Sequence, residues 1–276
     1  MSRFSKIFVL SALILLAACQ APTTYRPELT PEEIRAEQQA QQQMVDEISA
    51  QGGSKKNWKG KPDMRKQFER VASKIEEAGA EICREMGVPQ QGGECYYHFR
   101  IKQEDDVINA YADGENIVVN TAMLKFLQSD DELAAILGHE FAHNLMGHVD
   151  AGMKNTMAGA FVGLLLDAAA ASQGINTQGG FTQSGADMGR LTYSVEFEEE
   201  ADYVGLYVAS RAGYDVNKMP MVWRRMSIEN PDAIYNARTH PSNAARFVAL
   251  QKTIDEINYK RKHKVAMLPD IKTQAE

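Results

Sequence analysis

The sequence predicts a mainly helical α+β fold with one small antiparallel sheet. Apolar residues recur every three or four positions between residues 68 and 82. They alternate with polar residues between 97 and 119, and a helical pattern returns after residue 120. The chain of 276 residues is long enough for one sizeable domain or two small ones. Hydrophobic residues make up 44% and charged residues 24%, close to globular averages, which excludes disorder throughout.

The charge balance and the cysteine count exclude several classes of protein. Lys and Arg number 30 against 37 Asp and Glu, which gives a net charge of −7, and no basic stripe is present. We therefore expect no nucleic acid among the partners. Three cysteines are too few for a disulfide scaffold or a zinc-ribbon fold.

Residues 1–18 are expected to form a signal peptide. Arg3 and Lys6 precede an uncharged apolar run, residues 7–16, which is too short to span a bilayer comfortably. The run leads into Leu-Ala-Ala-Cys, which ends at Cys19 and resembles the lipobox of bacterial lipoproteins. The resemblance implies cleavage before Cys19, a lipid anchor on this residue and, because Gln20 follows it, an outer-membrane location facing the periplasm. The alternative is an ordinary signal peptide in which Cys19 has no role.

Residues 19–60 are expected to be a flexible tether that stands the following domain off the membrane. The segment contains three prolines, a glutamine-rich stretch at residues 38–43 and few large apolar residues. Within it, the stretch from Pro31 to Ile48 is expected to be partly helical.

Cys83 and Cys95 are the two cysteines that remain besides Cys19. An isolated pair 12 positions apart in an exported chain usually forms a disulfide. A metal-binding or redox pair would have a closer spacing, such as C-x-x-C. We therefore predict that these two residues are bridged.

The first half of the domain is expected to contain one helix and the sheet. Residues 68–82 present one apolar helical face, and Gly87 is expected to end this helix. Residues 97–101 alternate as a half-buried strand does. A β-hairpin is expected where residues 109–112 and 117–119 flank an Asp-Gly turn.

The next predicted helix carries the residues of a metal site. Ser129 and Glu132 have the spacing of a capping box at its start. His139 and His143 lie four positions apart, about 40° around the helix axis, so both imidazoles can bind one ion. Glu140 projects beside them, where it can accept a proton from water at the metal. This pattern predicts a zinc site with Glu140 as the catalytic base.

Two imidazoles leave zinc short of a third protein ligand. His148 is one candidate, but it lies about 140° from His143 on a continuing helix, so we expect it to have a capping or supporting role. Glu198 and Glu199 are the acidic candidates, and spacing alone excludes neither. Asp202 falls where the following helix becomes apolar, and a carboxylate there needs a partner such as the outer N–H of a zinc-binding histidine.

Three segments together resemble the zinc peptidase family that includes the CAAX prenyl protease and HtpX: His139-Glu140-Phe141-Ala142-His143, Glu198-Glu199-Glu200-Ala201-Asp202 and Thr239-His240-Pro241-Ser242. The resemblance covers roughly residues 65–260. It implies that Glu198 is the third ligand and that Asp202 supports the ligands from behind. It places His240 at the rim of the active site, where it stabilises the oxyanion or approaches the metal. It also implies that Arg246 holds this loop.

A fourth segment, Asn109-Ala110-Tyr111-Ala112, resembles the edge element N-A-[FY]-A of the same family. This implies that Asn109, Ala110 and Tyr111 bind substrate. We expect an extended substrate that adds a strand beside Asn116–Asn120.

Residues 157–172 form an apolar run of 16 residues that includes Asp167, short of the ~20 residues that a membrane span needs. We expect a buried or substrate-proximal helix here. The Gly-, Gln- and Ser-rich residues 173–185 that follow are expected to be a mobile loop near the cleft.

Together these features predict a lipid-anchored periplasmic endopeptidase whose catalytic domain spans residues 61–276 and holds one Zn2+. By family analogy, its substrates are misfolded or misassembled envelope proteins. The expected partners are protein or peptide substrates, the membrane through Cys19, and the assembly machinery of outer-membrane proteins. The alternative function is a chaperone or assembly factor for outer-membrane proteins, with latent or secondary protease activity.

Overall fold

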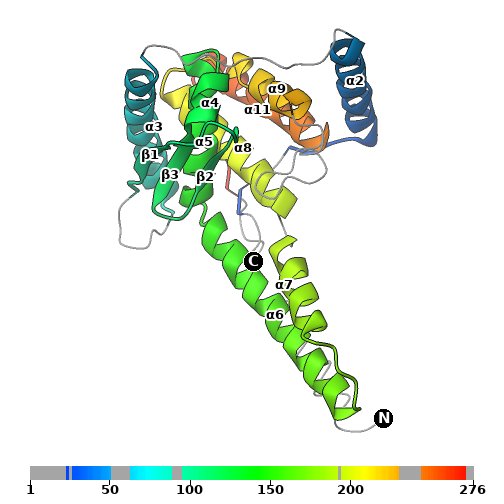
Figure 1. Ribbon diagram of the computed structural model, residues 1–276. Helices are drawn as coiled ribbons and strands as arrows, with labels where there is room; N and C mark the ends of the chain where they lie inside the picture. The colour runs from blue at the N-terminus through cyan, green and yellow to red at the C-terminus, as the bar shows by residue number, and fades with distance from the viewer. Residues whose placement is uncertain are drawn as a thin grey trace. The chain divides into compact units, whose positions relative to one another are not determined.

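The computed structural model describes residues 23–24, 27–50, 63–88, 95–191, 194–229 and 244–271 (Figure 1). The expected signal peptide and Cys19 lie outside these residues. The elements, in chain order, are α2 (Pro31–Ala50), α3 (Met64–Met86), β1 (His98–Lys102), β2 (Ala110–Ala112), β3 (Asn116–Asn120), α4 (Thr121–Phe126), α5 (Asp130–Leu145), α6 (His148–Ser172), α7 (Gly180–Leu191), α8 (Ser194–Arg211), the 3-10 helix η1 (Val216–Lys218), α9 (Pro220–Glu229) and α11 (Ala244–His263).

The chain divides into two compact units, which are described separately. The first, called the core below, consists of Thr23–Met146 and Glu198–Glu276. The second contains Gly147–Phe197, and its helices α6 and α7 are called the hairpin below. The predicted α+β class with a majority of helix is confirmed.

The sheet has the strand order β1-β3-β2 and is mixed rather than antiparallel. β3 pairs antiparallel with β2, as the predicted β-hairpin of residues 109–119 requires, but parallel with β1. In the turn between β2 and β3, Gly114 has a φ of 98°, and Asp113 Oδ1 accepts the N–H groups of Glu115 and Asn116. The chain therefore skips one strand position between β1 and β2, and β3 later fills it.

This order corrects the expected path of substrate. Both edges of Asn116–Asn120 are already paired, to β1 on one side and to β2 on the other, so no further strand can add beside β3. Of the described strands, β2 has an unpaired outer edge, and it lies next to β3 in the sheet.

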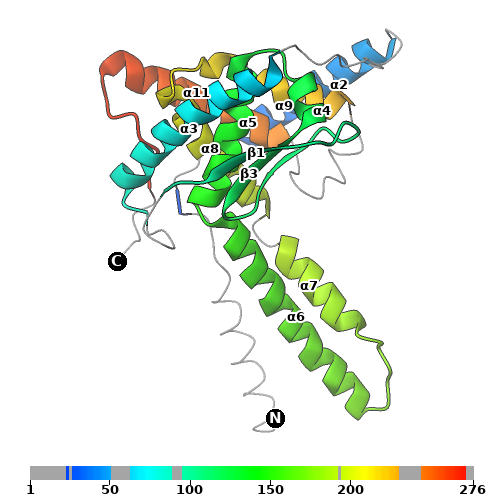
Figure 2. The same ribbon diagram turned by 60° about the vertical axis from the view of Figure 1, so that its left-hand side comes forward.

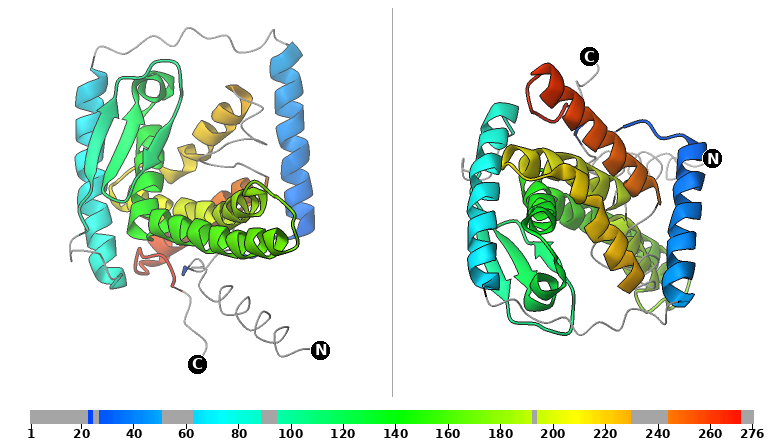
Figure 3. Two further views of the ribbon diagram at one scale, coloured as in Figure 1. Left: turned by 60° about the horizontal axis from the view of Figure 1, so that its bottom comes forward. Right: turned by 90° about the horizontal axis from the view of Figure 1, so that it is seen from above.

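The core is built around α5, whose side chains are buried from Glu132 to Leu145. The apolar face of α3 packs on α5, and α3 ends at Gly87, as its sequence pattern predicted. Tyr97 meets the ring of Phe141 edge-on at 5.1 Å, which connects the start of the sheet to α5. Viewed from above, α3 lies on one side of the core and α2 on the other, with the remaining core helices between them (Figure 3).

The described part of the segment expected as a tether lies against the core. α2 contacts α9 and α11, and Glu37 and Glu33 pair with Arg224 and Lys252 at 2.8 and 2.9 Å. Thr24 is fully buried and pairs with a residue of the C-terminal segment in an isolated antiparallel bridge. The expected helix is therefore present, and it packs on the core.

The hairpin differs in part from the expectations for its sequence: residues 157–172 are helical as expected but not buried, and the expected loop is shorter. α6 and α7 run antiparallel side by side (Figure 2), and residues from Gly180 onward are helical, so the predicted loop is confined to residues 173–179. α6 is not buried, because only 11% of its most apolar 18-residue stretch lies inside the protein. Among the described helices, α6 alone has the length and composition that would allow a membrane crossing. Sequence reasoning missed α7 because its glycines are typical of loops, whereas two of them, Gly185 and Gly189, are packing positions against α6.

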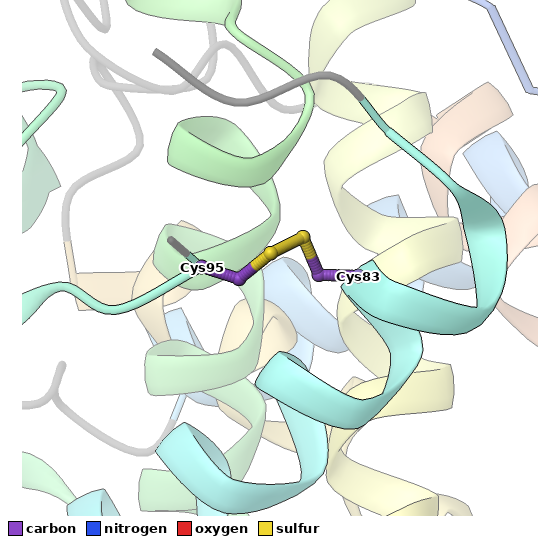
Figure 4. Close-up of a disulfide and its surroundings, with 2 residues drawn as sticks. All are labelled: Cys83 and Cys95. Atoms are coloured by element: carbon purple, nitrogen blue, oxygen red, sulfur yellow. A yellow bond between two sulfur atoms is a disulfide. The ribbon is translucent and has the colours of Figure 1, made fainter. Parts of the chain in front are cut away.

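Cys83 and Cys95 are joined by a disulfide, as their lone pairing predicted (Figure 4). Their Cα atoms are 6.2 Å apart, and the bridge ties the last turns of α3 to the segment that enters β1.

Candidate metal centre

His139 and His143 lie one turn apart on α5, and both are buried, at 3 and 8% exposed. Ser129 caps this helix by accepting the N–H of Glu132 at 3.2 Å. The Glu132 side chain binds the N–H of Gln128 and not that of Ser129, so half of the predicted capping box differs. The Nε2 atoms of the two histidines are 3.1 Å apart, so both imidazoles point to one place.

Glu198 on α8 completes a triangle of donor atoms. Its Oε2 lies 3.3 Å from His139 Nε2, and its Oε1 lies 3.3 Å from His143 Nε2. Two ligands of a tetrahedral zinc ion, each bonded at 2.0–2.1 Å, are about 3.3 Å apart. The separation of 3.1 Å between the two nitrogens therefore fits two ligands of one zinc ion, and each carboxylate oxygen of Glu198 lies at a ligand-to-ligand distance from one of these nitrogens. Together these residues form the one His, Cys, Asp and Glu group in the described chain whose ligand atoms could hold an ion.

Asp202 and Arg246 support this triangle from behind. Asp202 Oδ1 lies 2.9 Å from His139 Nδ1, which holds Nε2 toward the metal position. Arg246 donates from Nε and Nη2 to the two oxygens of Asp202 at 2.8 and 2.9 Å, and its Nη1 lies 3.1 Å from Glu198 Oε2. One guanidinium thus fixes both carboxylates, and all three side chains are buried.

The buried charges of this cluster shift the pKa values of its members. Burial alone would lower the pKa of His139, but hydrogen bonds and charge from Asp202 and Glu198 raise it to about 10. Burial would raise the pKa of Asp202, and the charges of Arg246 and His139 lower it. Burial opposes the charge of Arg246 as well, yet the two carboxylates raise its pKa. The two carboxylates thus favour positive charge at this place, which a zinc ion would supply.

A glycine contact sets the distance between α5 and α8. A Cβ atom on Gly138 would lie 2.7 Å from the carbonyl oxygen of Gly205, and one on Gly205 would lie 2.8 Å from the backbone N of His139. Real side chains do not make such contacts, so glycine at both positions lets the two helices touch. This approach brings Glu198 within reach of the histidines. Sequence reasoning missed this pair, and the signal was a glycine inside each of two predicted helices.

Comparison with known protein families matches residues 66–254 to peptidase family M48. The chain belongs to this family. M48 peptidases are zinc-dependent metallopeptidases, and the triangle of His139, His143 and Glu198 has the composition and spacing that zinc requires. The resemblance to a zinc peptidase family is therefore confirmed.

Several M48-related proteins have similar sequences. The chain is 32% identical to the mitochondrial metalloendopeptidase OMA1 of Arabidopsis thaliana over 51% of this chain and 28% of that protein. It is 29% identical to the beta-barrel assembly-enhancing protease of Escherichia coli over 54% of this chain and 33% of that protein. It is 32% identical to the mitochondrial metalloendopeptidase OMA1 of Schizosaccharomyces pombe over 57% of this chain and 47% of that protein. The matched part of this chain spans less than half the length of each of these relatives.

The remaining predicted residues of the M48 site fall as follows. Glu140 is buried on α5 directly after His139. Glu199 is half-buried and is not part of the donor triangle. His148 begins α6 and stacks on Phe197, with 4.7 Å between the ring centroids. His240 lies outside the described residues, so the loop that Arg246 was expected to hold is outside them as well.

Trp223 on α9 is a neighbour of the site that the sequence did not indicate. Its ring meets His139 edge-on with 5.9 Å between centroids, and it is 8% exposed. It thus forms part of the apolar wall around the imidazole, where a low dielectric strengthens the contacts of His139 with its carboxylates.

Proposed function

We propose that this M48 peptidase is a zinc-dependent endopeptidase of the bacterial cell envelope. The observation that carries the proposal is the donor triangle, in which two imidazole nitrogens 3.1 Å apart each lie 3.3 Å from an oxygen of one carboxylate, and whose ligands are held by buried charged partners. An ordinary structural ion pair would not need two imidazoles directed at one carboxylate.

Each residue of the site has a role in this proposal. His139, His143 and Glu198 would hold zinc, which supplies the Lewis acidity that polarises a scissile carbonyl and makes a water molecule more acidic. Glu140 would accept the proton of the attacking water and deliver it to the leaving amine. Asp202 would keep the ligating nitrogen of His139 in place, because its Oδ1 lies 2.9 Å from the other ring nitrogen.

The outer edge of β2 is the place where we propose that substrate binds. Ala110 and Tyr111, two of the residues expected to bind substrate, begin β2, and Asn109 directly precedes it. The backbone O of Asn109 is directed to the β3 side, where it accepts the N–H of Asn120 at 3.0 Å. β2 contacts α5, the helix that carries both histidines. An extended peptide added to β2 would therefore run alongside the helix of the catalytic residues.

Two further parts of the proposal rest on residues outside the described ones. Cys19 would carry the lipid that anchors the chain to the outer membrane, facing the periplasm. His240 would act at the rim of the site, stabilising the oxyanion. Misfolded or misassembled envelope proteins are the proposed substrates, in line with the relatives named beta-barrel assembly-enhancing protease.

The printed name of these relatives also supports a second candidate, a factor that assists outer-membrane protein assembly with proteolysis secondary. Glu140→Gln separates the two, because it removes the proposed base and leaves all three zinc ligands. We expect this variant to retain equimolar zinc and to lose casein degradation by at least about 1,000-fold, whereas the control Glu199→Gln keeps both. Undiminished casein cleavage by Glu140→Gln would refute the proposed mechanism. If Glu140→Gln still restores outer-membrane protein assembly in cells, assembly is the main function.

A further inference from the structure

The hairpin exposes an unusual amount of apolar surface. Ten of the sixteen large apolar side chains that are exposed in the described chain belong to residues 147–197. On α6 they occur on more than one face, for example at Phe161, Leu164 and Leu166, and on α7 they include Phe181 and Met188. A helix that is apolar all round is normally buried in a protein core or in a membrane.

Charge is almost absent from the same part of the chain. Residues 155–186 contain one charged side chain, Asp167, whereas the 24% of the whole chain would give about eight. Asp167 is engaged within the hairpin: its carboxylate accepts the N–H groups of Phe181 and Thr182 at 3.2 and 2.9 Å and the hydroxyls of Thr182 and Thr177. The one charge therefore caps the start of α7, and the four hydrogen bonds that it accepts all come from within the hairpin.

Glycine contacts hold the two helices of the hairpin together. A Cβ atom on Gly159 would lie 2.0 Å from the carbonyl oxygen of Gly185, and one on Gly163 would lie 2.0 Å from that of Phe181. The backbones therefore touch, and the large side chains point outward. Helix pairs in water bury their large apolar residues against each other, while close pairing through G-x-x-x-G spacing is typical of helices in lipid.

We propose that the α6–α7 hairpin inserts into a lipid bilayer from one side. The charge-free part of α7, Gly180 to Ala186, has seven residues and is about 10 Å long, so α7 is too short for a full span of about 30 Å. Beyond it, Asp187 and Arg190 are exposed and lie where they can face the headgroups.

The N-terminal segment independently favours lipid as the occupant of this surface. Thr24 is buried in the core, with its N–H bound to Glu200, and it follows Cys19 by five residues. A chain of five residues reaches at most about 17 Å. A lipid on Cys19 would thus keep the core within this distance of a bilayer, whose hydrocarbon can cover the apolar side chains of the hairpin. A second copy of the chain would instead require one complementary face, whereas α6 is apolar on several.

Vesicle flotation tests the proposal with the chain from residue 19 onward carrying Cys19→Ser, so that neither the lipid nor the apolar run of residues 7–16 contributes. With vesicles of phosphatidylethanolamine and phosphatidylglycerol, we expect this protein to float. The variant Phe161→Gln/Leu164→Gln/Met188→Gln, which keeps good helix formers, should lose at least about 100-fold in its partition coefficient. The matched control Val107→Gln/Tyr259→Gln removes exposed apolar side chains from the core and should change the coefficient less than about twofold.

A fluorescent label provides a second readout that needs only one substitution. With Cys83 and Cys95 bridged, Leu164→Cys places a lone free thiol on α6 in the Cys19→Ser protein. An environment-sensitive fluorophore there should shift to the blue when vesicles are added, and one at Tyr259→Cys should not. The proposal is overturned if the Cys19→Ser protein stays with the unbound fraction, if the control variant is released as strongly as the hairpin variant, or if light scattering without vesicles shows dimers that the hairpin variant abolishes.

Discussion

Replacing Gly205 by alanine should weaken zinc binding, although residue 205 touches none of the ligand atoms. The new Cβ would lie 2.8 Å from the backbone of Gly138 and from the N of His139, whereas ordinary contacts begin near 3.4 Å. α5 and α8 must therefore separate locally by about 0.6 Å, while zinc ligands tolerate about 0.2 Å. Because Glu198 lies on α8 and both histidines lie on α5, this separation widens the donor triangle.

The size of the effect follows from the cost of overpacking, about 1–3 kcal/mol. If zinc must pull the helices back together, this cost falls on the zinc-bound state alone, and the affinity drops by about 5- to 150-fold. Competition with a chromophoric chelator measures the change. Gly152→Ala on α6 is the control, because a Cβ there has no neighbour within 4 Å. A folded Gly205→Ala protein that binds zinc with unchanged affinity would refute the reasoning.

Three other predictions concern the groups that hold the site and the fold. Arg246→Met leaves the buried carboxylates of Glu198 and Asp202 without their cation. It should lower the free energy of unfolding of the zinc-free protein by about 3–5 kcal/mol in urea titrations. A loss below about 1 kcal/mol would contradict a stabilising role of this buried cluster. Asp202→Asn should keep zinc but bind it about 10- to 100-fold more weakly in the same chelator assay. The double variant Cys83→Ser/Cys95→Ser should lower the free energy of unfolding by about 3 kcal/mol, as expected for a loop closed over a sequence separation of 12. An unchanged melting temperature would count against a stabilising disulfide.

The parts of the fold that local pattern encodes were predictable. α3, the β2–β3 hairpin and the start of α5 follow from apolar periodicity, from an Asp-Gly turn and from Ser129 as a cap. The strand order was not predictable in this way, because the parallel pairing of β1 with β3 depends on contacts between distant residues. The exposure of α6 was missed for a related reason: an apolar run does not reveal whether protein or another medium covers it.

In the metal site, too, sequence pattern predicted the residues that are close in the chain and not those that only the fold brings together. The spacing of His139 and His143 on one helix is local, so it indicated two ligands directly, while Glu198 and Glu199 could not be separated without the family pattern. The three-dimensional structure separates them, because Glu198 alone lies 3.3 Å from both imidazoles. The double contact of Arg246 with Asp202 and Glu198 joins residues more than 40 positions apart, and no spacing rule predicts it.

Zinc content tests the central claim, that His139, His143 and Glu198 bind one zinc ion. Elemental analysis of three purified proteins is sufficient: the parent, Glu198→Gln and Glu199→Gln. We predict one zinc per chain in the parent and in Glu199→Gln, and far less than one in Glu198→Gln, because an amide replaces the carboxylate that closes the triangle. Stoichiometric zinc in Glu198→Gln together with its loss from Glu199→Gln would contradict the account.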